Sequence, residues 1–576
     1  MKRYLYIFLV SITAGSLSCK KDFLDEKPES FLSTSNAYST DADFNAAING
    51  IYGLVRNHYY TVNDFNPFWY LYRTDAYFDI SVTTPNMSGD IAPTGITNFA
   101  WAPHYEIISE ANTVLSRLPN STVLTDAQRK LYEAKAKFFR GLAYRALGYL
   151  YGGVPLVLEE TTNQKALNPD YVRATRAQVY AQAIEDLKFA AANLPDIARG
   201  GLKKGEISNV AAYHLLAEVY NTTKQYQEAA AAATAVISNP AMALMTARFG
   251  RRSIVTPGDV YWDLFQRGNQ NAAENREAIW VIQIETDVPG GGGSTTGGSQ
   301  FGVYGAERVH APLVRDLKSK VGTSDVALFN WPMGDYSGGR GVGFLCPSYW
   351  FSDSVWATDF NNDIRNANHN FVRDFVATNP KSPYYGQVVS TKNPPAGIIG
   401  VGGAITKGKH DRAFYPYQTK ATQPYDHPTA LYNSLAETDP VQKYLLKSGA
   451  GGLYIDQYFI RLAETYLLRA EAYIGLNQPA LAAADINKVR SRAGASDVLP
   501  ANVNIDYILD ERLRELGIEE KRMLTLMRLG KWVERTRKYN PFYGTQMKDN
   551  YNLWPIPFGE IEKNNKAVLE QNPGYN

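Results

Sequence analysis

The sequence predicts a mostly α-helical chain in which tetratricopeptide-like helical pairs, an α–α superhelix, frame a large loop-rich insertion with short β segments. Two distant stretches share one spacing of small and aromatic residues, typical of a helical hairpin of about 34 residues. They comprise Tyr213, Leu216, Ala217, Tyr220, Ala229, Ala233 and Val236, and later Tyr466, Ala470, Tyr473, Ala482, Ile486 and Val489. The segment between them is rich in Gly, Asn and Pro, which favours loops.

A third helical pair precedes the first of these stretches. Apolar residues at three- and four-residue steps predict one long helix over 125–151, ended by Gly152 and Gly153. The same pattern predicts a second helix over 175–194. The helical frame is therefore expected to come from both ends of the chain.

The insertion covers residues 241–454. Short apolar runs predict strands at 278–285 and 397–405, and a glycine-rich run at 289–298 predicts a flexible segment. Seven of the nine tryptophans fall between Trp69 and Trp356, in loop-rich sequence outside the clearest repeat helices, where binding residues tend to lie. The predicted organisation is a leader (1–18), an N-terminal helical part (19–240), a variable region that carries the ligand site (241–454) and a C-terminal part (455–576).

The N-terminus has the features of a secretory signal. Lys2 and Arg3 precede an apolar stretch of about 11 residues, and small residues follow directly before Cys19. The apolar stretch is too short to span a bilayer. A leader that stops at a cysteine resembles a bacterial lipoprotein signal, which predicts acylation of Cys19 and attachment to a membrane surface. The alternative is an ordinary secreted protein in which Cys19 merely follows the leader.

Charge and cysteine content exclude several classes of partner. The chain has 59 Lys and Arg against 57 Asp and Glu, and loss of Lys2 and Arg3 with the leader leaves 57 of each. A neutral mature chain argues against nucleic acid as a partner. Cys19 and Cys346 form no disulfide framework, and the seven histidines lie far apart in sequence. We therefore expect no metal site and no cofactor.

Aromatic residues next to polar ones are the candidates for ligand binding. A sugar needs flat apolar faces for its C–H side and planar polar groups for its hydroxyls. Trp69, Tyr72, Arg73 and Asp75 supply both within one short stretch. Strand-like alternation would separate Tyr72 from Trp69 and Arg73, so not all of them can touch one ligand. Packing of these aromatics in the core is an equally good alternative.

A second candidate group lies in the insertion. Trp331, Tyr349 and Trp350 are surrounded by Gly and Pro, which favours exposed loops. Trp101, by contrast, opens an apolar helix and is expected in the core. The charged run 511–522 has the spacing of an ion-paired helix, so we expect a structural role for it and no catalytic residues.

Several motifs resemble those of one known family. They cover both ends of the chain and the helical frame, and they weaken between about 250 and 450. They are CKKDFLDEKP (19–28), FFRGLAYR (138–145), GGVP (152–155), IRLAETYLLRAEA (460–472), INKVRSRAG (486–494), ERLRELGIEEKR (511–522), WPIP (554–557) and QNPGY (571–575). On these motifs the chain resembles the SusD/RagB family of Bacteroidetes nutrient-binding lipoproteins.

The resemblance implies a lipoprotein on the outside of the outer membrane. Such a protein captures an oligosaccharide or another nutrient and passes it to a SusC-like TonB-dependent transporter, and it binds without catalysis. Two alternatives stay open. One is a secreted helical glycoside hydrolase or lyase, for which Asp75 and Asp353 are the carboxylates to test. The other is a tetratricopeptide adaptor that binds protein alone.

Overall fold

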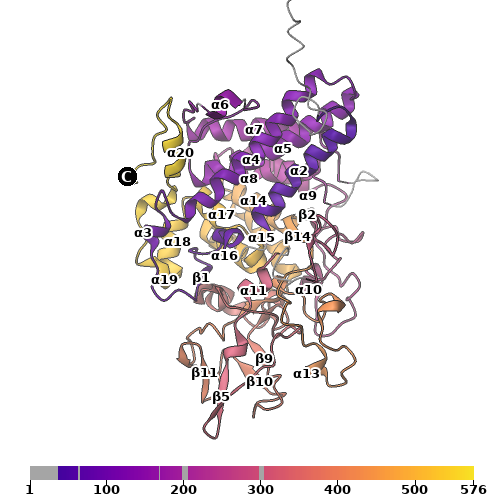
Figure 1. Ribbon diagram of the computed structural model, residues 1–576, viewed down its shortest axis with the longest axis vertical. Helices are drawn as coiled ribbons and strands as arrows, with labels where there is room; N and C mark the ends of the chain where they lie inside the picture. The colour runs from indigo at the N-terminus through magenta and orange to yellow at the C-terminus, as the bar shows by residue number, and fades with distance from the viewer. Residues whose placement is uncertain are drawn as a thin grey trace, which may run out of the picture.

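The computed structural model describes residues 37–61, 65–161, 163–167, 169–197, 205–296 and 304–575. Helices fill the upper part of the molecule in Figure 1, and strands and loops from the middle of the chain form its lower end. The predicted mostly α-helical fold is confirmed. The leader and Cys19 lie outside the described residues. None of the helices described is both long enough and apolar enough to cross a bilayer.

The elements follow each other in chain order. The α-helices are α2 (Asp41–Tyr59), α3 (Met87–Asp90), α4 (Trp101–Arg117), α5 (Asp126–Leu150), α6 (Asn163–Leu167), α7 (Arg176–Asn193), α8 (Asn209–Thr222), α9 (Tyr226–Ile237), α10 (Val260–Leu264), α11 (Ala306–His310), α12 (Tyr349–Ser352), α13 (Pro440–Lys443), α14 (Leu462–Gly475), α15 (Pro479–Arg492), α16 (Ile505–Glu515), α17 (Arg522–Arg528), α18 (Trp532–Tyr539), α19 (Pro541–Gly544) and α20 (Phe558–Lys563). The strands are β1 (Tyr77–Asp79), β2 (Ala278–Ile282), β3 (Glu285–Thr286), β4 (Gly292–Gly293), β5 (Lys318–Val321), β6 (Ser324–Ala327), β7 (Leu345–Pro347), β8 (Phe371–Val372), β9 (Asp374–Val376), β10 (Val388–Ser390), β11 (Ile398–Gly400), β12 (Gly403–Ala404), β13 (Tyr417–Gln418) and β14 (Gln457–Arg461). Short 3₁₀ helices connect many of them, among them η2 (Asn66–Tyr70).

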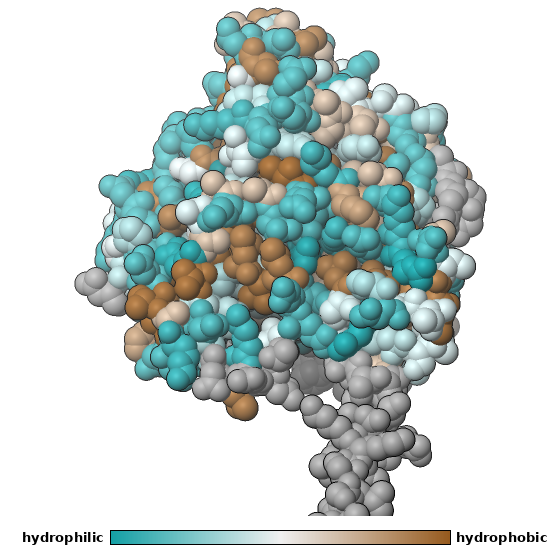
Figure 2. Space-filling model, turned by 90° about the horizontal axis from the view of Figure 1, so that it is seen from above, coloured by the Kyte–Doolittle hydropathy of each residue, from teal (hydrophilic) through white to brown (hydrophobic). Residues whose placement is uncertain are grey.

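The three predicted helical pairs are present and stack in order. Helix α5 packs on α7, α8 on α9, and α14 on α15. Contacts of α7 with α8 and of α9 with α14 join neighbouring pairs, so the first and last thirds of the chain form one helical body. Seen from the helical end, Figure 2 shows a mainly hydrophilic face with separate apolar groups.

Local sequence explains where the long helices begin and how closely they pack. Thr125 and Thr175 each form a capping box with the glutamine three residues later, which satisfies backbone N–H groups at the starts of α5 and α7. Gly148 in α5 lies against the ring of Tyr180 in α7, where a Cβ would approach Cε1 to 2.6 Å. A glycine is therefore required at this crossing.

The lower end has its own apolar core and short strands. Strands β12, β11, β5 and β6 form a four-stranded sheet, so the predicted strand region around residue 400 is confirmed. Buried residues between Ala311 and Tyr417 form a core separate from that of the helices. Strand β2, however, pairs with β14, and Trp280 on β2 packs on Phe138 of α5. Part of the predicted variable region thus belongs to the helical body.

The charged run 511–522 is buried and structural. Glu515 contacts the guanidinium groups of Arg461, Arg492 and Arg365, and every one of these side chains is at most 1% exposed. Burial by itself raises the pKa of Glu515, but the three arginines lower it well below the usual range. This network links β14, α15, α16 and the insertion. The predicted structural role of the charged run agrees with it, although the arginine partners of Glu515 come from distant segments and not from the same helix.

Candidate functional site

Aromatic side chains from four chain segments meet beside β1, where the helical body joins the lower end. We call this group the aromatic platform. It consists of Phe65 and Trp69 at η2, Phe78 on β1, Phe344 before β7, and Phe542 and Tyr543 on α19. Phe65 is 38% exposed, Tyr543 is buried, and the other four rings are half-buried. The platform therefore presents apolar ring surface to solvent.

Ring contacts and strand pairing position the platform residues. The centroid of Phe65 lies 5.7 Å from that of Trp69 in a stacked geometry, and 5.6 Å from that of Phe344. Phe542 lies 5.4 Å from Phe78 and 4.9 Å from Tyr543. The β1–β7 register, with the Ile80 N–H donating to the Phe344 carbonyl at 3.0 Å, puts Phe344 and Phe78 on one face.

Arg73 adds a polar group to the platform. Its guanidinium carbon lies 4.7 Å from the Trp69 centroid and 5.6 Å from that of Tyr543. The Nε group donates to Asp90 at 2.7 Å, while Nη1 is buried and has no hydrogen-bond partner among the described residues. A buried donor without a partner is costly, and an acceptor from a ligand would satisfy it.

The backbone of Arg73 is in a strained conformation. Its φ of 64° lies in the left-handed region, which non-glycine residues rarely adopt. The Arg73 carbonyl accepts hydrogen bonds from the Trp532 indole at 2.6 Å and from Thr536 at 3.3 Å, which hold this geometry. Strain that the surroundings enforce is typical of functional sites. Flat apolar faces beside an unsatisfied donor suit a polyhydroxylated ligand such as a sugar.

The structure places the four residues of the first predicted group, Trp69, Tyr72, Arg73 and Asp75, in different environments. Trp69 and Arg73 belong to the platform, whereas Tyr72 is fully buried beside Trp69, with ring centroids 5.6 Å apart. Asp75 is also fully buried, and it accepts hydrogen bonds from Arg522 at 2.7 and 2.9 Å and from Arg535 at 2.6 Å. The expectation that Asp75 contacts a ligand is therefore corrected, because its carboxylate is enclosed by two arginines. The buried Tyr72 hydroxyl has no hydrogen-bond partner among the described residues, and a ligand role for Tyr72 stays a prediction.

The second predicted group does not form one site. The neighbours Tyr349 and Trp350 diverge, because Tyr349 stacks on His410 at 4.1 Å and Trp350 stacks on Tyr539 at 4.0 Å. The Trp350 indole also donates to Asp510 at 3.2 Å, so Trp350 packs between α12, α16 and α18.

Trp331 lies apart from the platform, in the separate core of the lower end. The guanidinium carbons of Arg315 and Arg340 lie 4.9 and 5.2 Å from its centroid. It remains half-buried but shares no ring contact with the platform. A ligand role for Trp331 stays a prediction.

Five platform residues were not predicted, namely Phe65, Phe78, Phe344, Phe542 and Tyr543. Adjacent aromatics at 77–78 and 542–543 were a visible signal in the sequence. Their convergence depends on β1–β7 pairing and on contacts between the two ends of the chain, which sequence spacing does not show.

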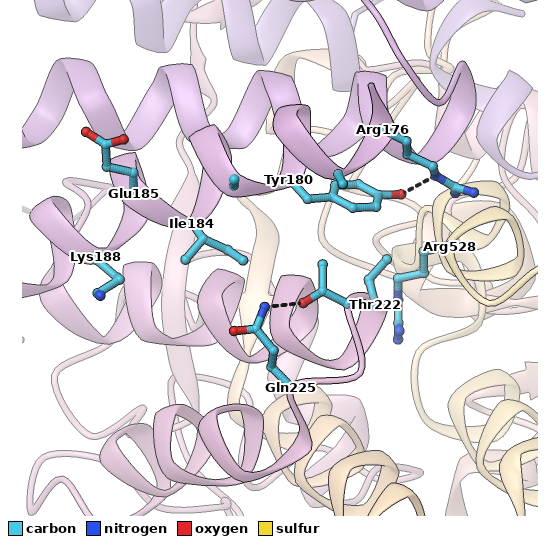
Figure 3. A pocket seen from close by; sticks show the side chains of 11 residues that line it. Arg176, Tyr180, Ile184, Glu185, Lys188, Thr222, Gln225 and Arg528 are labelled. Carbon is cyan, nitrogen blue, oxygen red and sulfur yellow. Dashed lines mark hydrogen bonds between the residues drawn. The ribbon is translucent and has the colours of Figure 1, made fainter. Parts of the chain in front are cut away.

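A groove of about 800 Å³ lies on the helical body, between α7 and the turn after α8 (Figure 3). Small side chains such as Ala177 and Ala181 line it, together with Arg176 and Lys188. The one aromatic ring there, Tyr180, uses its hydroxyl internally, accepting from Arg176 at 2.7 Å and donating to Gly148 at 3.0 Å. The groove thus lacks the stacked aromatic surface of the platform.

One buried group has the composition of a metal site. Ligand atoms of His214, Glu218 and Glu464 lie within 4.8 Å of one another. Arg145 is already paired with Glu218, and Arg512 with Glu464, so both carboxylates are compensated by guanidinium charge. That electrostatic environment disfavours a cation.

Comparisons with known proteins agree with this architecture. Residues 276–575, more than half of the chain, match the model of the SusD family, and residues 22–221 match a model described as "Starch-binding associating with outer membrane". SusD-like protein P38 of Formosa agariphila is 23% identical over 599 residues, which cover 100% of both chains.

Two solved structures share the fold. A "Laminarin binding SusD-like protein" is 23% identical with a TM-score of 0.64, covering 93% of this chain and 100% of that chain. Surface glycan-binding protein A from Bacteroides thetaiotaomicron, in complex with laminarihexaose, is 20% identical with a TM-score of 0.64 and covers 92% of this chain and 99% of its own.

Proposed function

Because the chain belongs to the SusD family, we propose that it is a glycan-binding lipoprotein of the outer membrane, which captures oligosaccharides and passes them to a SusC-like TonB-dependent transporter. The observation that carries the proposal is the aromatic platform with the unsatisfied Nη1 group of Arg73. Ring faces stack on the C–H side of a sugar, and the guanidinium donates to a hydroxyl oxygen.

The carboxylates near the platform favour binding over catalysis. A glycoside hydrolase needs two carboxyl groups about 5–10 Å apart that are free to act on a ligand. Asp75 is enclosed by two arginines, and Asp90 pairs with Arg73 at 2.6 Å. Asp353 accepts from the Ser352 hydroxyl and lies outside the platform. We therefore propose a receptor and no enzyme.

A glycan screen with two readouts tests the proposal. Laminarin and laminarihexaose come first in the panel, because they appear in the names of structures that share this fold. Calorimetric titration should show saturable binding of at least one oligosaccharide, and chromatography of the same samples should show intact sugar. Released products would indicate the hydrolase or lyase alternative, and a panel without any binder would count against a glycan receptor.

Membrane attachment should depend on Cys19. The Cys19→Ala variant has no thiol to acylate, and no described helix could anchor the chain in its place. We expect the variant in the soluble fraction or as unprocessed precursor, as measured by membrane fractionation and acyl labelling. Continued labelling of the variant and unchanged fractionation would contradict the proposed anchor.

The transporter should copurify with this protein from native membranes. Affinity purification in mild detergent is expected to recover a large β-barrel protein in roughly stoichiometric amount, because the stacked helical pairs offer an extended surface for a partner. Mass spectrometry of the recovered bands identifies it. Recovery of the lipoprotein alone, from cells that express both proteins, would refute the proposed hand-off.

A further inference from the structure

A second cavity lies far from the platform, on the helical body. It measures about 550 Å³ and lies between α4, α20 and lining residues from the segments 155–161, 163–167 and 169–171. Three aromatic residues, Trp101, Tyr105 and Tyr171, line it, and buried Ile108 and Leu569 lie deep in it. Its volume is that of a small-molecule site.

Four polar side chains of this cavity, those of Tyr105, Glu560, Lys563 and Asn564, already have partners within the protein. The Tyr105 hydroxyl donates to the Pro155 carbonyl at 2.8 Å. Asn564 accepts from the Tyr171 N–H and donates to the Tyr171 carbonyl, both at 2.8 Å. Lys563 at the mouth pairs with Glu560 at 2.9 Å. These four groups are engaged, so they are not free to replace the water that the hydroxyls of a sugar would lose on entering the cavity.

The mouth of the cavity is also apolar. Leu167, which lines the cavity, is 77% exposed. Leu158, Val172, Phe558 and Val568, which are 40–78% exposed, lie within two residues of lining residues in the sequence. The two segments that carry them are tied together, because the Lys566 N–H donates to the Pro169 carbonyl at 3.2 Å. An exposed apolar side chain such as Leu167 beside an aromatic-lined cavity favours an apolar ligand there.

We propose that this cavity binds a flat aromatic molecule of one or two rings, at a site independent of the aromatic platform. The ligand contacts the rings of Trp101, Tyr105 and Tyr171, which line the cavity. The centroids of Trp101 and Tyr105 lie 5.1 Å apart at an interplanar angle of 40°, which leaves differently inclined ring faces for offset or edge contacts. The proposal does not depend on the glycan function.

The probe for this site is 2-naphthol, titrated into the purified soluble protein by calorimetry. We expect one saturable site with a dissociation constant on the order of 0.1 mM, in line with the efficiency of small ligands. Ser109→Phe fills the cavity from α4 and should weaken binding at least about tenfold. Tyr171→Ala removes one ring from the wall and should weaken it roughly threefold to tenfold.

A matched control is Ala181→Phe, which places the same side chain in the separate groove of Figure 3 and should leave naphthol binding unchanged. Glycan affinity should be unchanged in all three variants, and thermal melts report whether each is folded. If Ser109→Phe does not fold, Tyr171→Ala decides. Absence of saturable naphthol binding by the wild-type protein, or equal binding by wild type and the folded cavity variants, overturns the proposal.

Discussion

Asp75→Ala is expected to lower the free energy of unfolding by about 3–5 kcal/mol. The substitution leaves the guanidinium groups of Arg522 and Arg535 buried without their shared carboxylate, and both arginines are at most 1% exposed. Urea unfolding followed by circular dichroism measures the change. The matched control is Asp549→Ala, which breaks an exposed pair with Arg537 and should cost well under about 1 kcal/mol. Equal effects of the two substitutions would contradict the structural role of Asp75.

The contribution of Asp75 should also depend on pH in a defined direction. Burial alone raises its pKa, but Arg522 and Arg535 lower it to about 2. The unfolded chain has an ordinary aspartate pKa of about 3.9. A carboxylate with a depressed folded-state pKa stabilises fully above about pH 4, and this stability is lost as the pH falls toward 2. The stability difference between wild type and Asp75→Ala should therefore shrink over this interval.

Trp69→Ala should weaken glycan binding tenfold to a hundredfold, about 1.4–2.8 kcal/mol. The variant loses the ring that stacks on Phe65 and faces the Arg73 guanidinium, so both the apolar surface and the orientation of the donor change. Calorimetric titration with the glycan identified in the screen gives the affinity, and a thermal melt of the same sample reports the fold.

Trp350→Ala is the control for this experiment. Its half-buried ring stacks on Tyr539 and shares no ring contact with a platform residue, so truncation should lower the melting temperature and leave the affinity unchanged. Unchanged affinity in Trp69→Ala would show that Trp69 does not contact the ligand. A loss of affinity in Trp350→Ala without a loss of stability would indicate that the ligand site lies in the insertion, as the sequence predicted.

The helical frame was predictable because its signals are local. The spacing from Tyr213 to Val236 recurs from Tyr466 to Val489 and reflects contacts within one hairpin, which sequence periodicity records directly. Helix α2 was not predicted, although its residues Phe44, Ile48, Ile51 and Val55 follow the same helical period on a buried face. The short strands were only partly predicted, because strands such as β1 and β7 are three residues each and depend on their pairing.

The sequence predicted only Trp69 and Arg73 of the platform site, because the other platform residues are brought there by tertiary contacts. Trp69 and Arg73 stand in a conspicuous aromatic string. Phe542 contacts Phe78 only after the two ends of the chain have met. Asp75 looked like a ligand contact because its two guanidinium partners lie in distant helices. Spacing along the chain identifies residue types that can bind a sugar, but tertiary contacts decide which of them stay at the surface.

The pairing of Asp75 with Arg522 and Arg535 also sets the order in which the protein can assemble. These partners lie 447 and 460 positions further along the chain. While the chain is being synthesised, the N-terminal half carries an uncompensated carboxylate at a position destined for the interior. Contacts of such high sequence separation slow folding and prolong the exposure of apolar surface. The buried ion-pair cluster around Asp75 can therefore close only after the last helices of the chain have been made.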